Sequence, residues 1–177
     1  MKHMLSGICC LGLLLSCAPN QTTQQQTADL AGVVNPMIGT DFTGNTYPGA
    51  QVPFGMVQLS PDNGLPGWDR ISGYFYPDST IAGFSHTHLS GTGAGDLYDI
   101  LFMPVTRPYK EAEGPLGIYS SFSHDEESAS AGYYRVRLKD YDILAELTAT
   151  ERCGVQRYTF PEADASIFLN LKKAMNW

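Results

Sequence analysis

The sequence has 177 residues, a formal net charge of −7 and 11% aromatic residues, with eighteen glycines and eleven prolines. The negative charge excludes a nucleic-acid-binding protein, which needs a concentrated basic face. The many turn-forming and aromatic residues favour an all-β domain over a helical bundle.

The first seventeen residues have the layout of a secretory signal, with a basic start at Lys2 and His3 and an apolar run from Ile8 to Leu15. The run is too short to span a bilayer, which takes about 20 residues. The ending "LLSC" resembles a bacterial lipobox, in which Cys17 becomes the lipidated first residue of the mature protein. Ordinary signal cleavage near this point is the alternative. Both interpretations predict export, and lipidation predicts anchoring at the cell envelope.

Residues 18–32 are polar and rich in Gln and Thr, which predicts a tether. The residues from Val33 onward, roughly 145 of them, suffice for one domain with a core. Cys153 is the single cysteine of this domain, so an intramolecular disulfide is impossible, and we expect it to be a small buried apolar side chain.

Residues 35–95 are dense in Gly, Pro, Asp, Asn and aromatic residues, with a strand signal at Gly55–Pro61. This composition predicts long, ordered loops, which are often functional. Within them Trp68, Asp69 and Arg70 place an aromatic ring beside charged hydrogen-bonding groups, an arrangement suited to gripping a sugar. The alternative is a core Trp68 with Asp69 and Arg70 as a solvated pair.

His86 and His88 would point to the same face if their segment were extended. Two adjacent imidazoles could bind a metal together with Asp96 or Asp99, satisfy loop backbone groups, or hydrogen-bond a polyol. The glycines of Ser90–Asp96 do not form a phosphate loop, because the nucleotide fingerprints need a following helix or a Gly-Lys-Ser/Thr sequence. Here "DLYDILFMP" follows, and we expect it to continue as a strand.

The remaining strand signals are an apolar run at Asp99–Val105, three alternating segments within Gly132–Phe160, and a segment beginning at Ala165. Alternation with period two indicates strands with one face on a core and the other in water. Successive strands joined by short turns predict an antiparallel meander, and the whole pattern predicts an antiparallel β-sandwich.

Several blocks, among them "VNPMIGTD", "GNTYPGAQVPFGMVQLSPD" and "GWDRISGYFYPDSTIAGFSHTHLSGTGAGDLYDILFMP", resemble the N-terminal domain of glycoside hydrolase family 92. These enzymes are exo-acting α-mannosidases, and the resemblance extends from about Val33 to the end of the chain. It implies a galactose-mutarotase-like β-sandwich followed by a larger (α/α)6 catalytic barrel. It also implies calcium dependence and hydrolysis with inversion, with the general acid, the general base and the calcium ligands chiefly in the barrel.

This resemblance implies that residues 33–177 hold an incomplete sandwich and lack the barrel. We therefore expect neither catalytic residues nor a metal site in this chain, and no activity from it alone. By resemblance, Trp68 and Asp69 would contact the terminal mannose of a glycan. Arg70 would belong to the same substrate-binding set, although relatives often carry an aromatic residue and a cysteine where this sequence has Arg70 and Ile71. His86, His88 and Asp96 would have supporting or interface roles.

Two alternatives remain open at this point. The first is a free-standing surface lipoprotein that binds glycans without cleaving them, although an incomplete sandwich would expose apolar edges. The second is a periplasmic metal carrier that uses His86 and His88.

Overall fold

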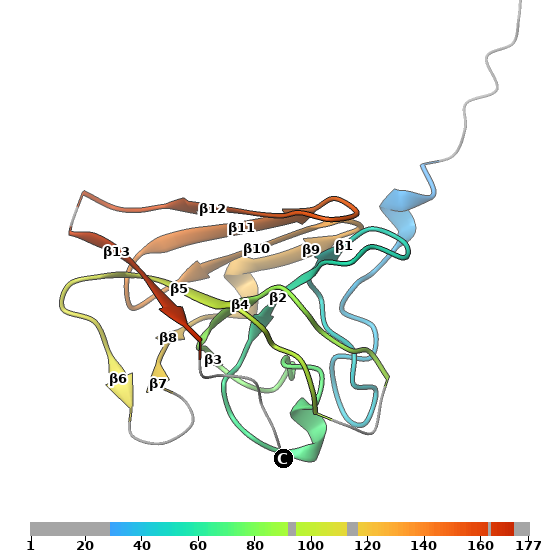
Figure 1. Cartoon of the computed structure of the whole chain (residues 1–177), viewed down its shortest axis with the longest axis horizontal. Helices are drawn as coiled ribbons and strands as arrows, with labels where there is room; N and C mark the ends of the chain where they lie inside the picture. The colour runs from blue at the N-terminus through green and yellow to red at the C-terminus, as the bar shows by residue number, and fades with distance from the viewer. Residues whose placement is uncertain (1–28, 92–94, 113–116, 163, 172–177) are drawn as a thin grey trace, which may run out of the picture.

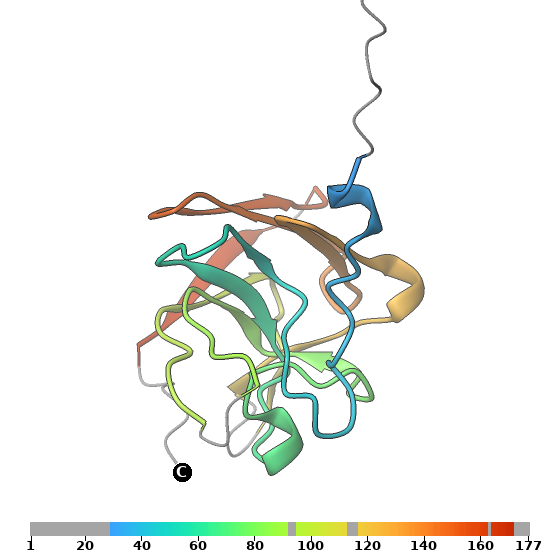
Figure 2. The same cartoon turned by 90° about the vertical axis from the view of Figure 1, so that its right-hand side faces the viewer.

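The computed structural model describes residues 29–91, 95–112, 117–162 and 164–171, and its strands form two stacked antiparallel sheets (Figures 1 and 2). The five-stranded sheet has the order β1 (Ala50–Gln51), β2 (Gln58–Asp62), β4 (Gly83–Ser85), β5 (Leu101–Thr106), β13 (Ala165–Asn170). The four-stranded sheet has the order β12 (Gly154–Thr159), β11 (Ile143–Ala149), β10 (Tyr133–Leu138), β9 (Glu127–Ser130). The predicted antiparallel β-sandwich is confirmed.

Short elements join or flank the two sheets. β3 (Thr80–Ile81) pairs with β8 (Ser120–Ser121), and β6 (Glu111–Ala112) pairs with β7 (Gly117–Ile118). The helical elements of the described residues are single 3₁₀ turns, η1 (Ala31–Val33), η2 (Trp68–Arg70) and η3 (His124–Glu126). Within these residues no helix has both the length and the apolar character needed to cross a membrane.

The core lies between the two sheets and follows the predicted alternation. In β10 and β11 the inward side chains are at most 1% exposed; they are Tyr134, Val136, Leu138, Ile143, Ala145 and Leu147. Leu59, Phe84 and Val105 of the facing sheet are completely buried in the same cluster. Removal of this apolar surface from water is the main force that stacks the sheets.

The predicted meander of β10, β11 and β12 is also present, with Val136 opposite Ala145 and Leu147 opposite Gln156. β9 extends it on the other side. The other boundaries differ slightly from prediction, because β2 begins at Gln58 and β5 begins at Leu101.

β13 lies at the edge of its sheet and pairs with β5. Its side chains alternate, so Phe168 packs against the core while Ile167 and Leu169 are about half exposed, at 53% and 49%. β13 is therefore an apolar, exposed edge strand. Residues 172–177, predicted to continue this segment, lie outside the described part.

The expectation that Cys153 is buried is wrong. It is exposed in the turn between β11 and β12, where its carbonyl accepts a hydrogen bond from the Thr150 N–H at 2.8 Å. The predicted signal segment, including Cys17, and most of the predicted tether lie outside the described residues, and the end of the tether forms η1.

Glu146 on the outer face of β11 is held by two neighbouring strands. The Arg157 guanidinium donates two hydrogen bonds to its carboxylate, both at 2.6 Å, and the Tyr133 hydroxyl donates a third at 2.5 Å. These donors, Arg157 first and Tyr133 second, lower the pKa of Glu146 to about 2.

A carboxyl whose pKa is lowered by folding stabilises the folded state above its unfolded value, about 4.3, and loses that contribution as the pH falls toward about 2. We expect the Glu146 carboxyl carbon to titrate near pH 2 in an NMR pH series, and Arg157→Ala to move this midpoint up toward the ordinary value. Lys139→Ala, which removes an exposed cation from β10's far end, is the control. A midpoint that Arg157→Ala leaves in place would contradict the assignment of the cause.

Candidate functional site

The loop of residues 63–78, called here the Trp68 loop, leaves the end of β2 and carries η2 at its tip. Gly67, with φ of 148°, starts the turn, and its carbonyl accepts a hydrogen bond from the Arg70 N–H at 3.0 Å. Trp68 is 57% exposed, so it is not the core residue of the alternative interpretation. Among the described residues the Asp69 carboxylate has no hydrogen-bond partner. The indole is therefore presented to solvent, and Asp69 beside it is partly buried.

Arg70 turns back into the loop and does not join this exposed pair. Its guanidinium donates to both oxygens of the Asp78 carboxylate, at 2.6 and 2.5 Å, and lies 4.7 Å from the centre of the Phe75 ring. The hydrogen bonding to Asp78 raises the pKa of Arg70. The side chain of Arg70 is 23% exposed, so we assign it mainly to supporting the loop.

Asn63 closes the base of the Trp68 loop and is completely buried. Its side-chain amide donates to the Thr80 carbonyl at 2.7 Å, and its side-chain oxygen accepts from the Phe75 N–H at 2.5 Å. Its own N–H donates to the Gly73 carbonyl at 2.9 Å. Buried polar groups that lack partners are costly, so these bonds fix the loop's two ends together.

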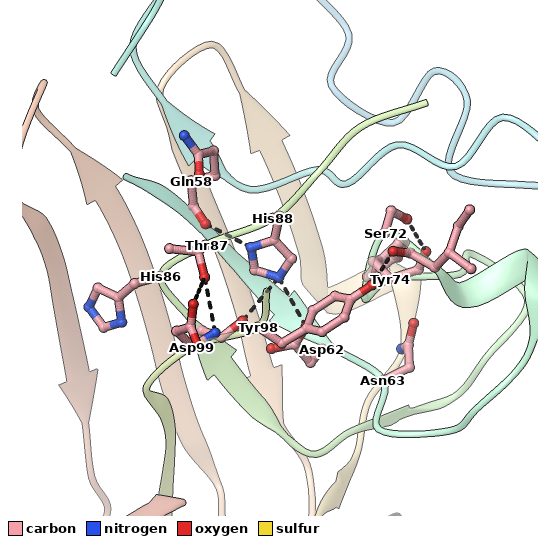
Figure 3. Close-up of polar contacts among 12 residues, drawn as sticks. Gln58, Asp62, Asn63, Ser72, Tyr74, His86, Thr87, His88, Tyr98 and Asp99 are labelled. Carbon is pink, nitrogen blue, oxygen red and sulfur yellow. Dashed lines mark hydrogen bonds and ion pairs between the residues drawn. The ribbon is translucent and has the colours of Figure 1, made fainter. Parts of the chain in front are cut away.

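His88 lies beneath the loop and is the centre of a buried polar cluster (Figure 3). Its Nδ1 lies 2.7 Å from the Gln58 carbonyl oxygen, and its Nε2 lies 3.0 Å from Asp62 Oδ1 and 3.1 Å from Ser85 Oγ. The Tyr98 ring meets the imidazole edge-on at 5.7 Å between centres. His88 therefore supports the site from below and does not reach solvent.

His86 points elsewhere, and the expected same-face arrangement of the two histidines is wrong. Its Nδ1 lies 3.2 Å from the Ile100 carbonyl oxygen, and its Nε2 lies 3.3 Å from the Gln156 side-chain nitrogen. Figure 3 shows its ring directed away from that of His88. β4 ends at Ser85, so the period-two alternation on which the expectation relied stops before these residues.

Asp96 and the residues after it form a tight loop and not the expected strand. Leu97, Tyr98 and Ile100 have positive φ angles of 79°, 62° and 60°. Such angles are unfavourable for residues with a Cβ and persist only where surrounding contacts hold them. The Tyr98 hydroxyl donates to the Ile71 carbonyl, which ties this segment to the Trp68 loop. Asp96 is exposed, and its carboxylate accepts from the Leu97 N–H at 2.8 Å.

Sequence reasoning identified the exposed tip but missed Asp62, Asn63 and Tyr98, which attach the loop to the sandwich. The sequence offered one weak signal, since an Asp-Asn-Gly turn directly follows the predicted strand.

No three His, Cys, Asp or Glu side chains among the described residues come together in a way that could hold a metal ion. Calcium takes six to eight oxygen ligands, and the described residues bring together no group of three carboxylates to supply them.

The family model for the glycosyl hydrolase family 92 N-terminal domain matches residues 33–177. The structure of the α-mannosidase BT3965 from Bacteroides thetaiotaomicron, solved with mannoimidazole, is 48% identical and has a TM-score of 0.76 over 81% of this chain and 20% of its own. The inverting mannosidase BT2199 from the same organism is 32% identical, with a TM-score of 0.61 over 76% of this chain and 18% of its own. A curated relative from Arthroderma benhamiae, an "uncharacterized secreted glycosidase", is 28% identical over 88% of this chain and 20% of its own length.

These matches identify a glycoside hydrolase segment whose fold is similar to part of solved mannosidase structures. The chain belongs to glycosyl hydrolase family 92 and contains its N-terminal domain. It spans about a fifth of the length of the relatives it matches, at 20% of both BT3965 and the fungal protein.

Gly73 allows a direct test of how tightly the Trp68 loop is seated. A Cβ there would lie 2.3 Å from Asp62 Oδ1, 2.9 Å from Tyr98 Cε1 and 3.0 Å from His88 Cδ2, whereas one on Gly132 would meet nothing within 4 Å. Both glycines have positive φ, 89° and 75°. We expect Gly132→Ala to lower the free energy of unfolding by about 1–2 kcal/mol from backbone strain alone. Gly73→Ala should cost a further ~1–3 kcal/mol from overpacking.

Urea denaturation of the two variants measures the difference. Equal losses of unfolding free energy for Gly73→Ala and Gly132→Ala would mean that the residues around Gly73 move to accommodate a Cβ. That result would contradict close packing at the base of the loop.

Proposed function

We propose that this chain is the N-terminal part of an exo-α-mannosidase, and that its Trp68 loop forms one wall of the pocket for the terminal mannose. The observation that carries the proposal is the exposed Trp68 indole beside the partly buried Asp69, on a loop whose base is buried and hydrogen-bonded. The C–H face of a pyranose packs well on an indole ring, and an ionised carboxylate accepts strong hydrogen bonds from sugar hydroxyls. The relatives named as mannosidases support this choice of sugar.

The hydrolytic step itself belongs, in this proposal, to polypeptide outside this chain. Inverting glycosidases place a carboxylic acid and a carboxylate about 6.5–9.5 Å apart on opposite sides of the scissile bond. The name of BT2199 as an inverting mannosidase supports inversion here. The proposed calcium ion likewise binds chiefly in the catalytic domain, where it would help to fix the substrate. The chain alone would then release no mannose from α-mannosides.

Within this scheme the predicted site residues have separate tasks. Trp68 and Asp69 contact the sugar, Arg70 braces the loop through Asp78, and His88 supports it from beneath. His86 and Asp96, both near the Gly-rich segment, have supporting or interface roles.

The alternative is a free-standing lipoprotein that binds glycans without cleaving them. One observation favours this alternative. The two sheets bury a hydrophobic core between them, and such a core can stabilise a domain without further polypeptide. Mannoside binding by a soluble, cooperatively folding chain would support this alternative, while an exposed edge such as β13 speaks against it.

For location, we propose export and anchoring of Cys17 to the bacterial envelope through lipid. The secreted relative supports export, and the sequence around Cys17 supports lipidation. Partners would then be the membrane, the enzyme's own catalytic domain and a mannose-containing glycan.

The sugar contact can be tested in a hybrid enzyme in which residues 33–177 replace the matching segment of BT3965. We expect Trp68→Ala and Asp69→Ala each to lower kcat/KM on an α-mannoside by about 10–100-fold, because each removes a contact to the bound sugar. Tyr109→Ala is the matched control, since this 39%-exposed aromatic packs against Phe168 at the far edge of the sheet. An active hybrid that tolerates Trp68→Ala without loss would refute the assignment.

The lipid anchor can be tested by metabolic labelling with an alkyne fatty acid in a bacterial host. The full chain should acquire the label and sediment with membranes, and Cys17→Ser should lose both properties because the acylated sulfur is gone. Cys153→Ser, which removes the exposed turn cysteine, should keep them. Label retained by Cys17→Ser would rule out Cys17 as the acylated residue.

A further inference from the structure

Three side chains from outside the tip of the Trp68 loop converge on the backbone of Gly73. Asp62 ends β2, His88 follows β4 and Tyr98 precedes β5, and a Cβ on Gly73 would lie within 3.0 Å of an atom of each. Figure 3 shows the rings of His88 and Tyr98 beside Asp62, with the Trp68 loop beyond them. The position of Gly73 relative to the sandwich is therefore set by this cluster.

The hydrogen bonds of His88 determine how many protons its ring carries. The Gln58 carbonyl oxygen, 2.7 Å from Nδ1, can only accept, so Nδ1 carries a proton. Nε2 lies 3.0 Å from Asp62 Oδ1. The Ser85 hydroxyl, 3.1 Å from Nε2, can donate to an unprotonated Nε2, but that nitrogen would still set its lone pair against the Asp62 carboxylate oxygen. A second ring proton removes that repulsion and gives an imidazolium that donates to two acceptors.

The surroundings make this charge pairing important. The side chain of His88 is 0% exposed and that of Asp62 is 7% exposed. Among the described residues Asp62 Oδ2 is buried without a hydrogen-bond partner, and His88 is the basic side chain in contact with this carboxylate. An unpaired charge in such a site is costly.

Among the described residues, the rings of the titratable side chains Tyr47 and Tyr98 also pack against His88, while their hydroxyls donate to Gln51 and to the Ile71 carbonyl. Burial raises the pKa of Tyr47 to about 12 and, with smaller contributions from Asp62 and Asp96, raises that of Tyr98 further. Both phenols therefore stay protonated. Tyr98 remains a donor to the Ile71 carbonyl, two residues before Gly73.

We propose that His88 is a positioning residue for sugar recognition. In its doubly protonated form it donates to Gln58 and Asp62, holds Asp62 against Gly73, and thereby fixes Trp68 and Asp69 toward the substrate. The role in recognition rests on the proposed function, whereas the fastening of the loop stands on the contacts alone.

The proton count is tested on the full chain by ¹⁵N NMR of the histidine rings at pH 7. Both nitrogens of His88 should show shifts typical of protonated ring nitrogens. An unprotonated nitrogen on His88 would overturn the proposal. Asp62→Asn should convert the ring to the neutral form protonated at Nδ1, because the new amide can donate to Nε2.

The fastening is tested by amide hydrogen exchange in the same chain. His88→Ala should accelerate exchange at the Asn63 and Phe75 amides by roughly tenfold or more, with the β10 amide of Val136 unchanged, because the opening is local. Asp62→Asn should keep the native protection, since a neutral hydrogen bond replaces the ionic one. His86→Ala is the matched control and should leave the loop amides unaffected. A uniform acceleration of loop and core, or none, would overturn the positioning role.

If His88→Ala fails to fold, His88→Gln takes its place. The Gln side chain keeps one donor but not the charge, so it should produce the same local acceleration. Native exchange rates in a folded His88→Gln protein would equally overturn the proposal.

The link to recognition is tested by titrating methyl α-mannoside while following the Trp68 indole N–H, with the Trp177 indole as internal reference. Loss of His88 should weaken the Trp68 response. Measured by calorimetric titration, the affinity of Trp68→Ala/His88→Ala for methyl α-mannoside should be no lower than that of Trp68→Ala alone. Additive losses would overturn the positioning link. A wild-type Trp68 signal that mannoside does not move would count against the proposed sugar contact, while the exchange results would still decide the fastening.

Discussion

Hydrogen bonds from buried side chains to loop backbone hold together the part of this molecule between Asn35 and Ile100. Strands there are short, so many buried N–H and C=O groups lack ladder partners, and each one left unpaired would cost about 1–3 kcal/mol. Asn63, Ser72 and His88 supply the missing partners; Ser72 Oγ, for example, lies 3.0 Å from the Thr46 carbonyl oxygen. Without these bonds the exposed tip of the Trp68 loop would have no defined position over the sandwich.

The predictability of the fold follows from how local its determinants are. In β10 and β11 the alternation lies in consecutive residues. The strands themselves, the side chains that point into the core and the order of the strands could therefore be predicted from the sequence. The sequence could not indicate that Cys153 sits in an exposed turn or that Leu97 and Tyr98 adopt left-handed angles. The left-handed angles depend on contacts with segments far along the chain. Tyr98, for instance, bonds to Ile71, 27 residues earlier.

The same distinction between local patterns and distant contacts applies to the residues of the candidate site. Trp68 and Asp69 could be proposed from residue type and family resemblance, because an exposed ring beside a carboxylate is a local pattern. Their supports, Asp62 and Asn63, gave almost no signal, since a buried Asp or Asn looks like any turn residue until the fold brings a partner to it. The prediction that His86 and His88 share one face was wrong for a geometric reason, because β4 ends one residue before His86.

The contacts of the Trp68 loop separate its tip from its base. The residues that brace it do so through backbone groups or through Arg70 and Asp78, and none of these bonds involves the side chains of Trp68 or Asp69. Folding therefore places few demands on which side chains occupy those two positions. Over evolutionary time a lineage can therefore exchange these two side chains without passing through unstable intermediates. The base of the loop is in this sense a support whose stability does not depend on the side chains at its tip.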